Sequence, residues 1–335
     1  LTLSLEGGKG MERSLTKYFI KRFIFALITI IAIISLNFYL FRIMPGNPVI
    51  LLYRSPELSA SRIKILTEQF GLNKPLWEQF FIYVYNTLTG NWGISFYYKQ
   101  PVFNVIIPAM LNSLILLIPA TFLSIILGIF TGTISAWKRG TKIDFAFLGT
   151  ALAFYAMPTF WFGAILILLA LYIGGIPISG MYTIGVYNSN PISQLIDLLS
   201  HLVLPLITLT LVYYGQFTII MRNSLIDVFT EDYIITAKAK GADEKWIIKK
   251  HAVPNAMLPM VSIIAINFGL VVTGAILTEA IFSWPGVGLL IYDSIMARDY
   301  PVLQGTFLIV AITVVMANFI ADIIYARLDP RIRYQ

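Results

Sequence analysis

The sequence predicts an all-α integral membrane protein with six transmembrane helices and both termini in the cytoplasm. Of the 335 residues, 58% are hydrophobic and only 12% are charged, which is about half the charged share of a soluble domain. Six apolar stretches approach the roughly 20 residues that a helix needs to cross the hydrocarbon of a bilayer. The chain has no cysteine, which excludes disulfides and thiolate metal sites.

The six predicted spans divide the chain into successive parts. Residues 1–16 form a polar extension with no assigned role, and residues 17–44 form the first transmembrane helix. Residues 45–111 form a folded extracytoplasmic segment. Residues 112–326 form a five-helix core, and residues 327–335 a cytoplasmic tail. The core spans are expected near residues 112–137, 145–173, 201–221, 257–279 and 304–326.

The distribution of basic residues predicts the orientation of the spans. Loops rich in Lys and Arg alternate with loops that are nearly free of them: residues 174–200 have none, and the loop after the fifth span has only Arg298. Cationic loops are retained in the cytoplasm, so the basic side is cytoplasmic. Its residues are Lys17, Lys21, Arg22, Lys138, Arg139, Lys142, Arg222, Lys238, Lys240, Lys245, Lys249, Lys250, Arg327, Arg331 and Arg333. The net charge of +7 is therefore a topology signal, and no nucleic-acid partner is expected.

The long connection between the first two spans is predicted to contain a helix. Asn73 and Pro75 mark its start and Gly90 follows its end. Its apolar positions repeat at helical spacing and are Leu76, Phe80, Tyr83 and Val84. Two interpretations of this apolar face remain open: packing against the outer rim of the protein itself, or docking of a partner that delivers solute.

Motifs for catalysis are not found in the sequence. The two histidines, His201 and His251, do not form H-E-x-x-H, and there is neither a G-x-S-x-G nor a G-x-x-x-x-G-K-[ST] motif. We therefore expect no enzyme, no metal site and no nucleotide bound by this chain. An ion-coupled secondary transporter remains an alternative, but the acids of the spans lie near span ends, at Glu279 and Asp322. Asp322 is expected to snorkel or to pair with Arg327.

The loop between the fourth and fifth spans, residues 224–259, is too polar for lipid and too patterned for a linker. Thr230 with the two acids after it indicates a helix start, and Gly241 can end that helix with a positive φ. Asp243 can cap a second short helix that runs through Trp246. The pattern predicts two short helices that meet at a protruding corner.

Pro254 and Pro259 are expected to mark the turn from this loop into the fifth span. A rigid corner of this kind could receive a push from a cytoplasmic partner. An ordinary solvated basic loop is an equally good interpretation of the spacing alone.

The same segment resembles the coupling loop of importer-type ABC permeases, which reads E-A-A, three residues, Gly, nine residues, Ile-x-Leu-Pro. Gly241 and Pro254 have the matching spacing, but the leading Glu is replaced by Ile235. The dipeptide and oligopeptide branch of that family has the pattern found at Thr236–Gly241 and His251–Ala256. The resemblance implies that the coupling residues are Thr236, Ala237, Lys238, Ala239, Lys240, Gly241, Ala242, Asp243, Glu244, Trp246, His251, Pro254 and Asn255.

Further segments resemble the B-type subunit of that branch, in the same order along the chain. They are residues 42–48, 71–76, 90–95, 157–161, 279–288, 298–301 and 329–334. Asn47 and Leu289 depart from the Asp and Arg usual there. The segment after the fifth span is expected to form an outer gate or a packing scaffold, through Glu279, Phe282, Trp284, Pro285, Gly286 and Gly288.

The resemblance implies a subunit of an importer in the cytoplasmic membrane. Its partners would be a second, C-type permease, two ATPase subunits that bind ATP and Mg, an extracytoplasmic solute-binding protein, and the lipid bilayer. Peptides are the default solute, with oligosaccharides or nickel as alternatives.

Overall fold

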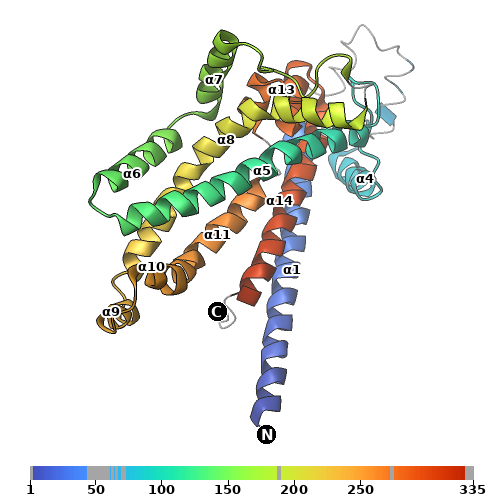
Figure 1. Ribbon diagram of the computed structural model, residues 1–335. Helices are drawn as coiled ribbons and strands as arrows, with labels where there is room; N and C mark the ends of the chain where they lie inside the picture. The colour runs from blue at the N-terminus through green and yellow to red at the C-terminus, as the bar shows by residue number, and fades with distance from the viewer. Residues whose placement is uncertain are drawn as a thin grey trace. The chain divides into compact units, whose positions relative to one another are not determined.

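The computed structural model describes residues 3–43, 61, 64, 67–68, 73–186, 190–271 and 275–328. The regular structure within these residues is helical, apart from a single β-bridge between Ile94 and Pro101. The chain divides into two compact units, one made of Leu1–Met110 with Leu290–Gln335 and the other of Leu111–Leu289 (Figure 1). The motif residues 44–48, 71–72 and 329–334 lie outside the described residues.

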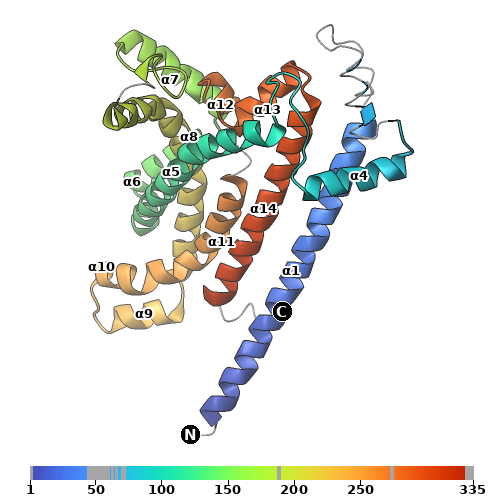
Figure 2. The same ribbon diagram turned by 90° about the vertical axis from the view of Figure 1, so that its right-hand side faces the viewer.

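The first unit is built on two long helices, α1 (Leu3–Ile43) and α14 (Tyr300–Leu328), which pack against each other (Figure 2). Helix α1 thus begins well before the predicted start at residue 17. The rings of Phe23 and Phe319 lie 6.1 Å apart. Beside them Asp322, which we expected to pair with Arg327 or to snorkel, forms an ion pair of 3.2 Å with Arg22.

Helix α4 (Leu76–Leu88) confirms the helix predicted after the first span. It follows Pro75 and ends before Gly90, which has a φ of 77°. The rings of Phe80 and Tyr83 lie 5.4 and 5.5 Å from the ring of Phe38 on α1. This part of the apolar face therefore packs within the chain itself, whereas Leu76 is exposed.

The second unit is organised around the 38-residue helix α8 (Pro191–Val228). Helices α6 (Lys142–Tyr155), α7 (Thr159–Ile173) and α11 (Val253–Val271) pack against α8. Glycine lets two helices approach each other closely, because it has no side chain between them. At Gly215 of α8 a Cβ would collide with the backbone carbonyl oxygen of Ala151 on α6. Similarly, Gly128 of α5 (Val102–Trp137) lies against Phe217 of α8. These contacts fix the helices to which the candidate site is attached.

The third predicted span is not one straight helix. Helices α6 and α7 are bent by 102° at a short break that contains Pro158, the N-cap residue of α7. Proline cannot donate a backbone hydrogen bond, and it disfavours the helical conformation of the residue before it. The span predicted over residues 145–173 is therefore bent near Pro158 and consists of two helices.

Within the described residues, four helices are long and apolar enough to cross a membrane, or five if the bent pair counts as one span. The four segments are Phe19–Arg42, Val102–Trp137, Pro191–Val228 and Tyr300–Ile320. The second and fourth predicted spans thus lie in helices that start about ten residues earlier than expected. The helix of the fifth predicted span, α11, ends at Val271, and α12 (Ile276–Ile281) begins after Ala275; residues 272–274 lie outside the described residues.

Candidate functional site

Two short helices form the corner predicted between the fourth and fifth spans. Helix α9 (Asp232–Ala239) and helix α10 (Glu244–Ile247) lie next to each other (Figure 2). Gly241 joins them with a φ of 79°, and its N–H donates to the carbonyl oxygen of Lys238 at 2.9 Å. The carboxylate of Asp243 accepts from the backbone N–H of Trp246 at 3.2 Å and so caps α10. We call residues 232–247 the hairpin.

The inner face of the hairpin is buried against the long helices. Ile234 of α9 and Ile247 of α10 are almost completely buried. They belong to one apolar cluster with residues of α5, α8 and α11. The other buried members are Ile125, Ala136, Phe217, Met221, Leu225, Ala252, Ala256 and Met260. A displacement of the hairpin would therefore be transmitted to α8 and α11 through close-packed side chains.

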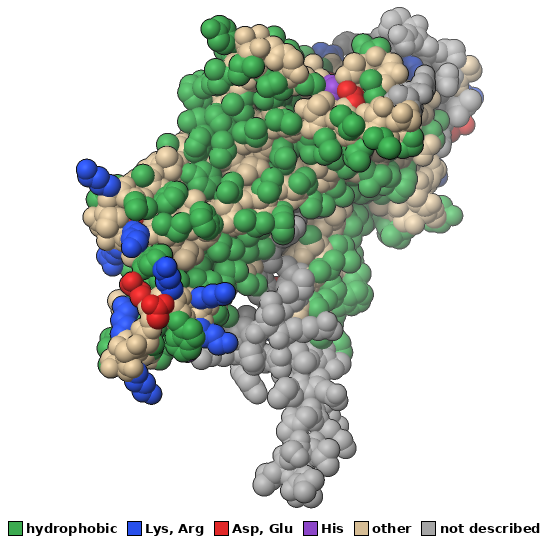
Figure 3. All heavy atoms as spheres, viewed as in Figure 1, with side chains coloured by type: hydrophobic (Ala, Val, Ile, Leu, Met, Phe, Trp, Pro, Cys, Tyr) green, Lys and Arg blue, Asp and Glu red, His purple; other side chains and the backbone are tan. Residues whose placement is uncertain are grey.

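The outer face of the hairpin exposes apolar and cationic side chains together. Ile235 and Trp246 are 55% and 51% exposed, and the Trp246 ring lies 4.8 Å from the His251 ring. Lys and Arg side chains gather around the hairpin (Figure 3). Partial burial, together with the neighbouring Glu231, raises the pKa of the Tyr233 hydroxyl.

The prolines after the hairpin lie where the chain turns from α10 into α11, but they do not interrupt the helical structure (Figure 2). Helix α10, a π-helical turn (η2, Ile248–Ala252) and α11 follow one another without an interruption. Pro254 lies in the first turn of α11 and Pro259 lies inside it. Because proline lacks a donor, a widened turn next to Pro254 accommodates the missing hydrogen bond. The amide of Asn255 donates to the carbonyl oxygen of His251 at 2.7 Å, across the junction between η2 and α11.

All thirteen sequence-predicted coupling residues lie in the hairpin, in η2 or in the first turn of α11. Ala237, Ala242 and His251 are partly buried. The exposed residues are Thr236, Lys238, Ala239, Lys240, Gly241, Asp243, Glu244, Trp246, Pro254 and Asn255.

A second group of predicted residues surrounds the carboxylate of Glu279, which is 0% exposed. Its Oε1 accepts from the Ser113 hydroxyl at 2.7 Å and from the Ala275 N–H at 3.3 Å. Its Oε2 accepts from the N–H groups of Gly288 and Leu289 at 2.7 and 3.3 Å. Backbone and hydroxyl donors thus replace the water that the carboxylate loses on burial.

The segment between Glu279 and Gly288 is closed tightly around this carboxylate. A Cβ on Gly286 would lie 2.3 Å from Glu279 Oε2 and 2.4 Å from Ser113 Oγ, so no side chain fits there. The buried Trp284 donates its indole N–H to the carbonyl oxygen of Asn112 at 2.8 Å. The Asn112 amide donates in return to the carbonyl oxygen of Pro285 at 2.9 Å. We call Glu279–Gly288 with Asn112 and Ser113 the carboxylate knot.

Phe282 connects the knot to two other parts of the second unit. Its carbonyl oxygen accepts from the N–H of Gly180 at 2.8 Å. Its ring is buried against Gly163 of α7, where a Cβ would lie 3.0 Å from the ring. The structure therefore brings the six predicted gate or scaffold residues together, and all of them except Pro285 are buried.

Two family descriptions match this chain. Residues 124–334 match the binding-protein-dependent transport system inner membrane component, and residues 15–117 match the N-terminal region of that membrane component. The chain belongs to this family. It is accordingly a multi-pass membrane component of a binding-protein-dependent transport system.

Curated relatives of this inner membrane component cover almost its whole length. It is 35% identical over 336 residues to the dipeptide transport system permease protein of Escherichia coli K12, with 95% of this chain and 99% of the relative covered. It is also 35% identical over 319 residues to the oligopeptide transport system permease protein of Bacillus subtilis, with the same coverage. A glutathione transport system permease protein of E. coli O1:K1 is 33% identical, again with 95% and 99% covered.

A solved structure supports the fold of this inner membrane component. An inward-facing form of the MetNI methionine ABC transporter matches with a TM-score of 0.52 and 17% identity, over 67% of this chain and 96% of that chain. At this identity the match shows that the two chains share a fold.

The sequence patterns missed a buried ion pair and the partners of the knot. Asp144 of α6 receives two hydrogen bonds from Arg222 of α8, at 2.8 and 2.9 Å, and further hydrogen bonds from the Ser135 hydroxyl and the Gly140 N–H. From the sequence, Arg222 indicated only the cytoplasmic side of the membrane. The adjacent polar residues Asn112 and Ser113 near the start of a long apolar stretch were the available signal for the knot.

Proposed function

We propose that this chain forms half of the translocation path of an ABC importer for dipeptides or oligopeptides. The proposed assembly contains a second, C-type permease, two cytoplasmic ATPase subunits that bind ATP and Mg, and an extracytoplasmic solute-binding protein. The names of the relatives support a peptide solute, because dipeptide, oligopeptide and glutathione transport all concern short peptides.

We propose that the hairpin couples ATP hydrolysis to transport, because it has one exposed and one buried face. The outer face exposes Ile235 and Trp246, which can dock into an ATPase subunit, since aromatic anchors dominate many interfaces. The inner face is buried with α8 and α11. A push at the Gly241 corner would therefore move these helices as a body between inward-open and outward-open states.

The energy for this switch is proposed to come from the ATPase subunits. A ligand or partner shifts a conformational equilibrium only by its differential affinity for the two states. The sequence has no phosphate-binding loop, so closure of the ATPase pair around ATP is the proposed source of the difference.

The proposed topology has six spans with both termini and the hairpin in the cytoplasm. The basic residues of the hairpin, including Lys238, Lys240 and Lys245, support this side assignment. The fifth and sixth spans would be α11 with α12, and α14. Within this topology we assign the carboxylate knot to a scaffold rather than a moving gate, since Glu279 already uses both oxygens in hydrogen bonds.

The test is the Gly241→Val variant in the complete reconstituted transporter. Valine cannot easily adopt the positive φ of this corner, so solute-stimulated ATP hydrolysis should be lost while the chain still inserts into the membrane. Gly174→Val is the matched control, because Gly174 also has a positive φ, of 78°, with nothing within 4 Å of a Cβ, yet lies outside the hairpin.

Normal stimulation in Gly241→Val would overturn the coupling assignment, as would an equal loss in Gly174→Val. The ABC class itself is tested by purification: ATPase subunits should co-purify with this chain. Solute uptake by this chain alone under an ion gradient would instead show a secondary transporter.

A further inference from the structure

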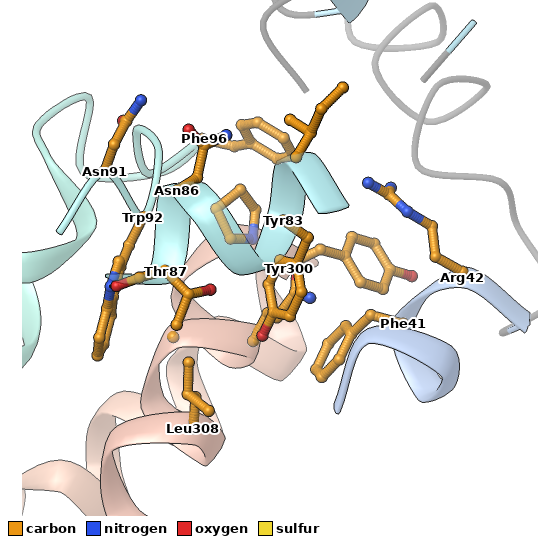
Figure 4. Close-up of a pocket in the computed structure, with 14 residues that line it drawn as sticks. Phe41, Arg42, Tyr83, Asn86, Thr87, Asn91, Trp92, Phe96, Tyr300 and Leu308 are labelled. Carbon is orange, nitrogen blue, oxygen red and sulfur yellow. The ribbon is translucent and has the colours of Figure 1, made fainter. Parts of the chain in front are cut away.

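A small cavity lies within the first unit, between α1, α4, α14 and the loop after α4 (Figure 4). Its volume is about 80 Å³, well below the roughly 300–1,000 Å³ of pockets that enclose a drug-sized ligand. The cavity can therefore enclose a small group, such as a phosphate, but not a peptide. It is found at the end of the candidate span Phe19–Arg42 that lies opposite Lys21 and Arg22.

The charge of the cavity lining favours an anion. Arg42 is the one charged residue among the described residues that line it, and no carboxylate joins it there. The Nε of Arg42 is buried without a hydrogen-bond partner, and its guanidinium group lies 5.4 Å from the centre of the Phe38 ring. A buried charged donor without a partner is costly, so an anionic oxygen placed beside it would be bound favourably.

Other polar groups of the cavity wall are already held in place. The Tyr83 hydroxyl accepts from the Asn37 amide at 3.0 Å, and the same amide donates to the carbonyl oxygen of Gln304 at 3.0 Å. The Trp92 indole N–H donates to the carbonyl oxygen of Thr87 at 3.1 Å. The cavity therefore has a pre-formed wall, which lowers the entropic cost of binding.

The apolar part of the cavity continues onto an exposed surface. Phe41 lines the cavity and its ring lies 6.3 Å from the ring of Phe307 on α14. Phe307 is exposed, as are Leu36 and Leu40 of α1. Both helices contain candidate membrane spans, Phe19–Arg42 and Tyr300–Ile320, that end near the cavity. An acyl chain could therefore follow this surface while its head group occupies the cavity.

We infer that this cavity binds the head group of an anionic phospholipid such as phosphatidylglycerol. The phosphate would pair with Arg42, and the head-group hydroxyls would face the side-chain amides of Asn86 and Asn91, which also line the cavity. The acyl chains would lie on the exposed residues of α1 and α14. This lipid site goes beyond the proposed transport function and does not depend on it.

Native mass spectrometry of the delipidated full-length chain, after addition of phosphatidylglycerol or phosphatidylcholine, tests the site. The wild type should retain phosphatidylglycerol in preference to phosphatidylcholine. Arg42→Gln should weaken phosphatidylglycerol binding about tenfold or more, because it removes a charged hydrogen bond. Arg42→Lys should keep most of the binding. Lys74→Gln is the matched control, since Lys74 is a solvent-accessible cation of the same unit outside the cavity.

A second measurement locates the lipid and guards against a folding defect. Brominated phosphatidylglycerol should quench the fluorescence of the wild type more than that of Trp92→Phe, because Trp92 lines the cavity. Equal lipid retention by the wild type and Arg42→Gln would overturn the inference, and so would equal quenching in Trp92→Phe. Binding of free glycerol phosphate as tight as that of the lipid would assign the cavity to a soluble phosphate instead.

Discussion

The carboxylate knot and the hairpin both depend on glycine, but for different physical reasons. In the knot, Gly286 is required for space, because a Cβ would collide with Glu279 and Ser113. In the hairpin, Gly241 is required for its φ of 79°, and nothing lies within 4 Å of its Cβ position. The knot thus cannot change without breaking packing and hydrogen bonds, whereas the hairpin corner has free space around it.

The carboxylate knot is therefore expected to stay rigid, whereas the hairpin can bind a partner. A buried carboxylate with four donors has one low-energy arrangement. A hairpin with one buried and one exposed face can keep its packing while a partner binds the exposed face. The comparison predicts that substitutions in the knot reduce stability, and that substitutions on the outer face of the hairpin reduce coupling.

The largest effect is expected for Glu279→Ala. The change leaves the donors of Ser113, Ala275, Gly288 and Leu289 without an acceptor, and each buried unsatisfied donor costs about 1–3 kcal/mol. The free energy of unfolding should fall by more than about 4 kcal/mol, measured by thermal unfolding of the purified chain in detergent. A loss below about 1 kcal/mol would show that water reaches these donors and that the knot is not closed.

Ile247→Ala should give the next largest loss of stability. Removing a completely buried Ile side chain leaves a cavity between α10 and the long helices, at a cost of about 3 kcal/mol. The same unfolding measurement checks this value. Stability equal to that of the wild type would mean that the inner face of the hairpin is not packed, and the proposed transmission to α8 and α11 would lose its basis.

Gly286→Ala and Gly241→Ala test directly the two reasons for glycine. Overpacking at Gly286 should cost about 2 kcal/mol, whereas the positive φ at Gly241 should cost about 1 kcal/mol. A side chain at Gly241 meets no other atom, so alanine and serine should lower the free energy of unfolding by the same amount there. At Gly286 the larger serine should lower it more than alanine does. Equal dependence on size at the two positions in unfolding experiments would contradict the comparison.

Trp246→Ala should have the smallest effect on stability. The side chain is half exposed, so the free energy of unfolding should change by less than about 0.5 kcal/mol. Solute-stimulated ATP hydrolysis in the reconstituted transporter should nevertheless fall. Full stimulation would show that the ATPase subunits do not use this side chain, and Tyr172→Ala, another exposed aromatic far along the chain, controls for general loss of surface area.

Local sequence signals were sufficient for the hairpin and for α4. Asp243 and Gly241 act within a few residues of their own position, through a cap and through a backbone angle, so their effects can be predicted without knowing the rest of the fold. The same holds for Pro75 and Gly90 around α4. Local signals did not predict the π-helical turn before Pro254, which keeps the helical structure continuous from α10 into α11.

The composition and the apolar stretches alone determined the class of the protein, because water and lipid impose that pattern on any membrane chain. The tertiary structure decided which polar groups meet. Glu279 and Ser113 are 166 positions apart, and Asp144 and Arg222 are 78 apart. No local pattern specifies such pairs, since they exist only once the helices have packed and excluded water, and burial then makes each partner indispensable to the other.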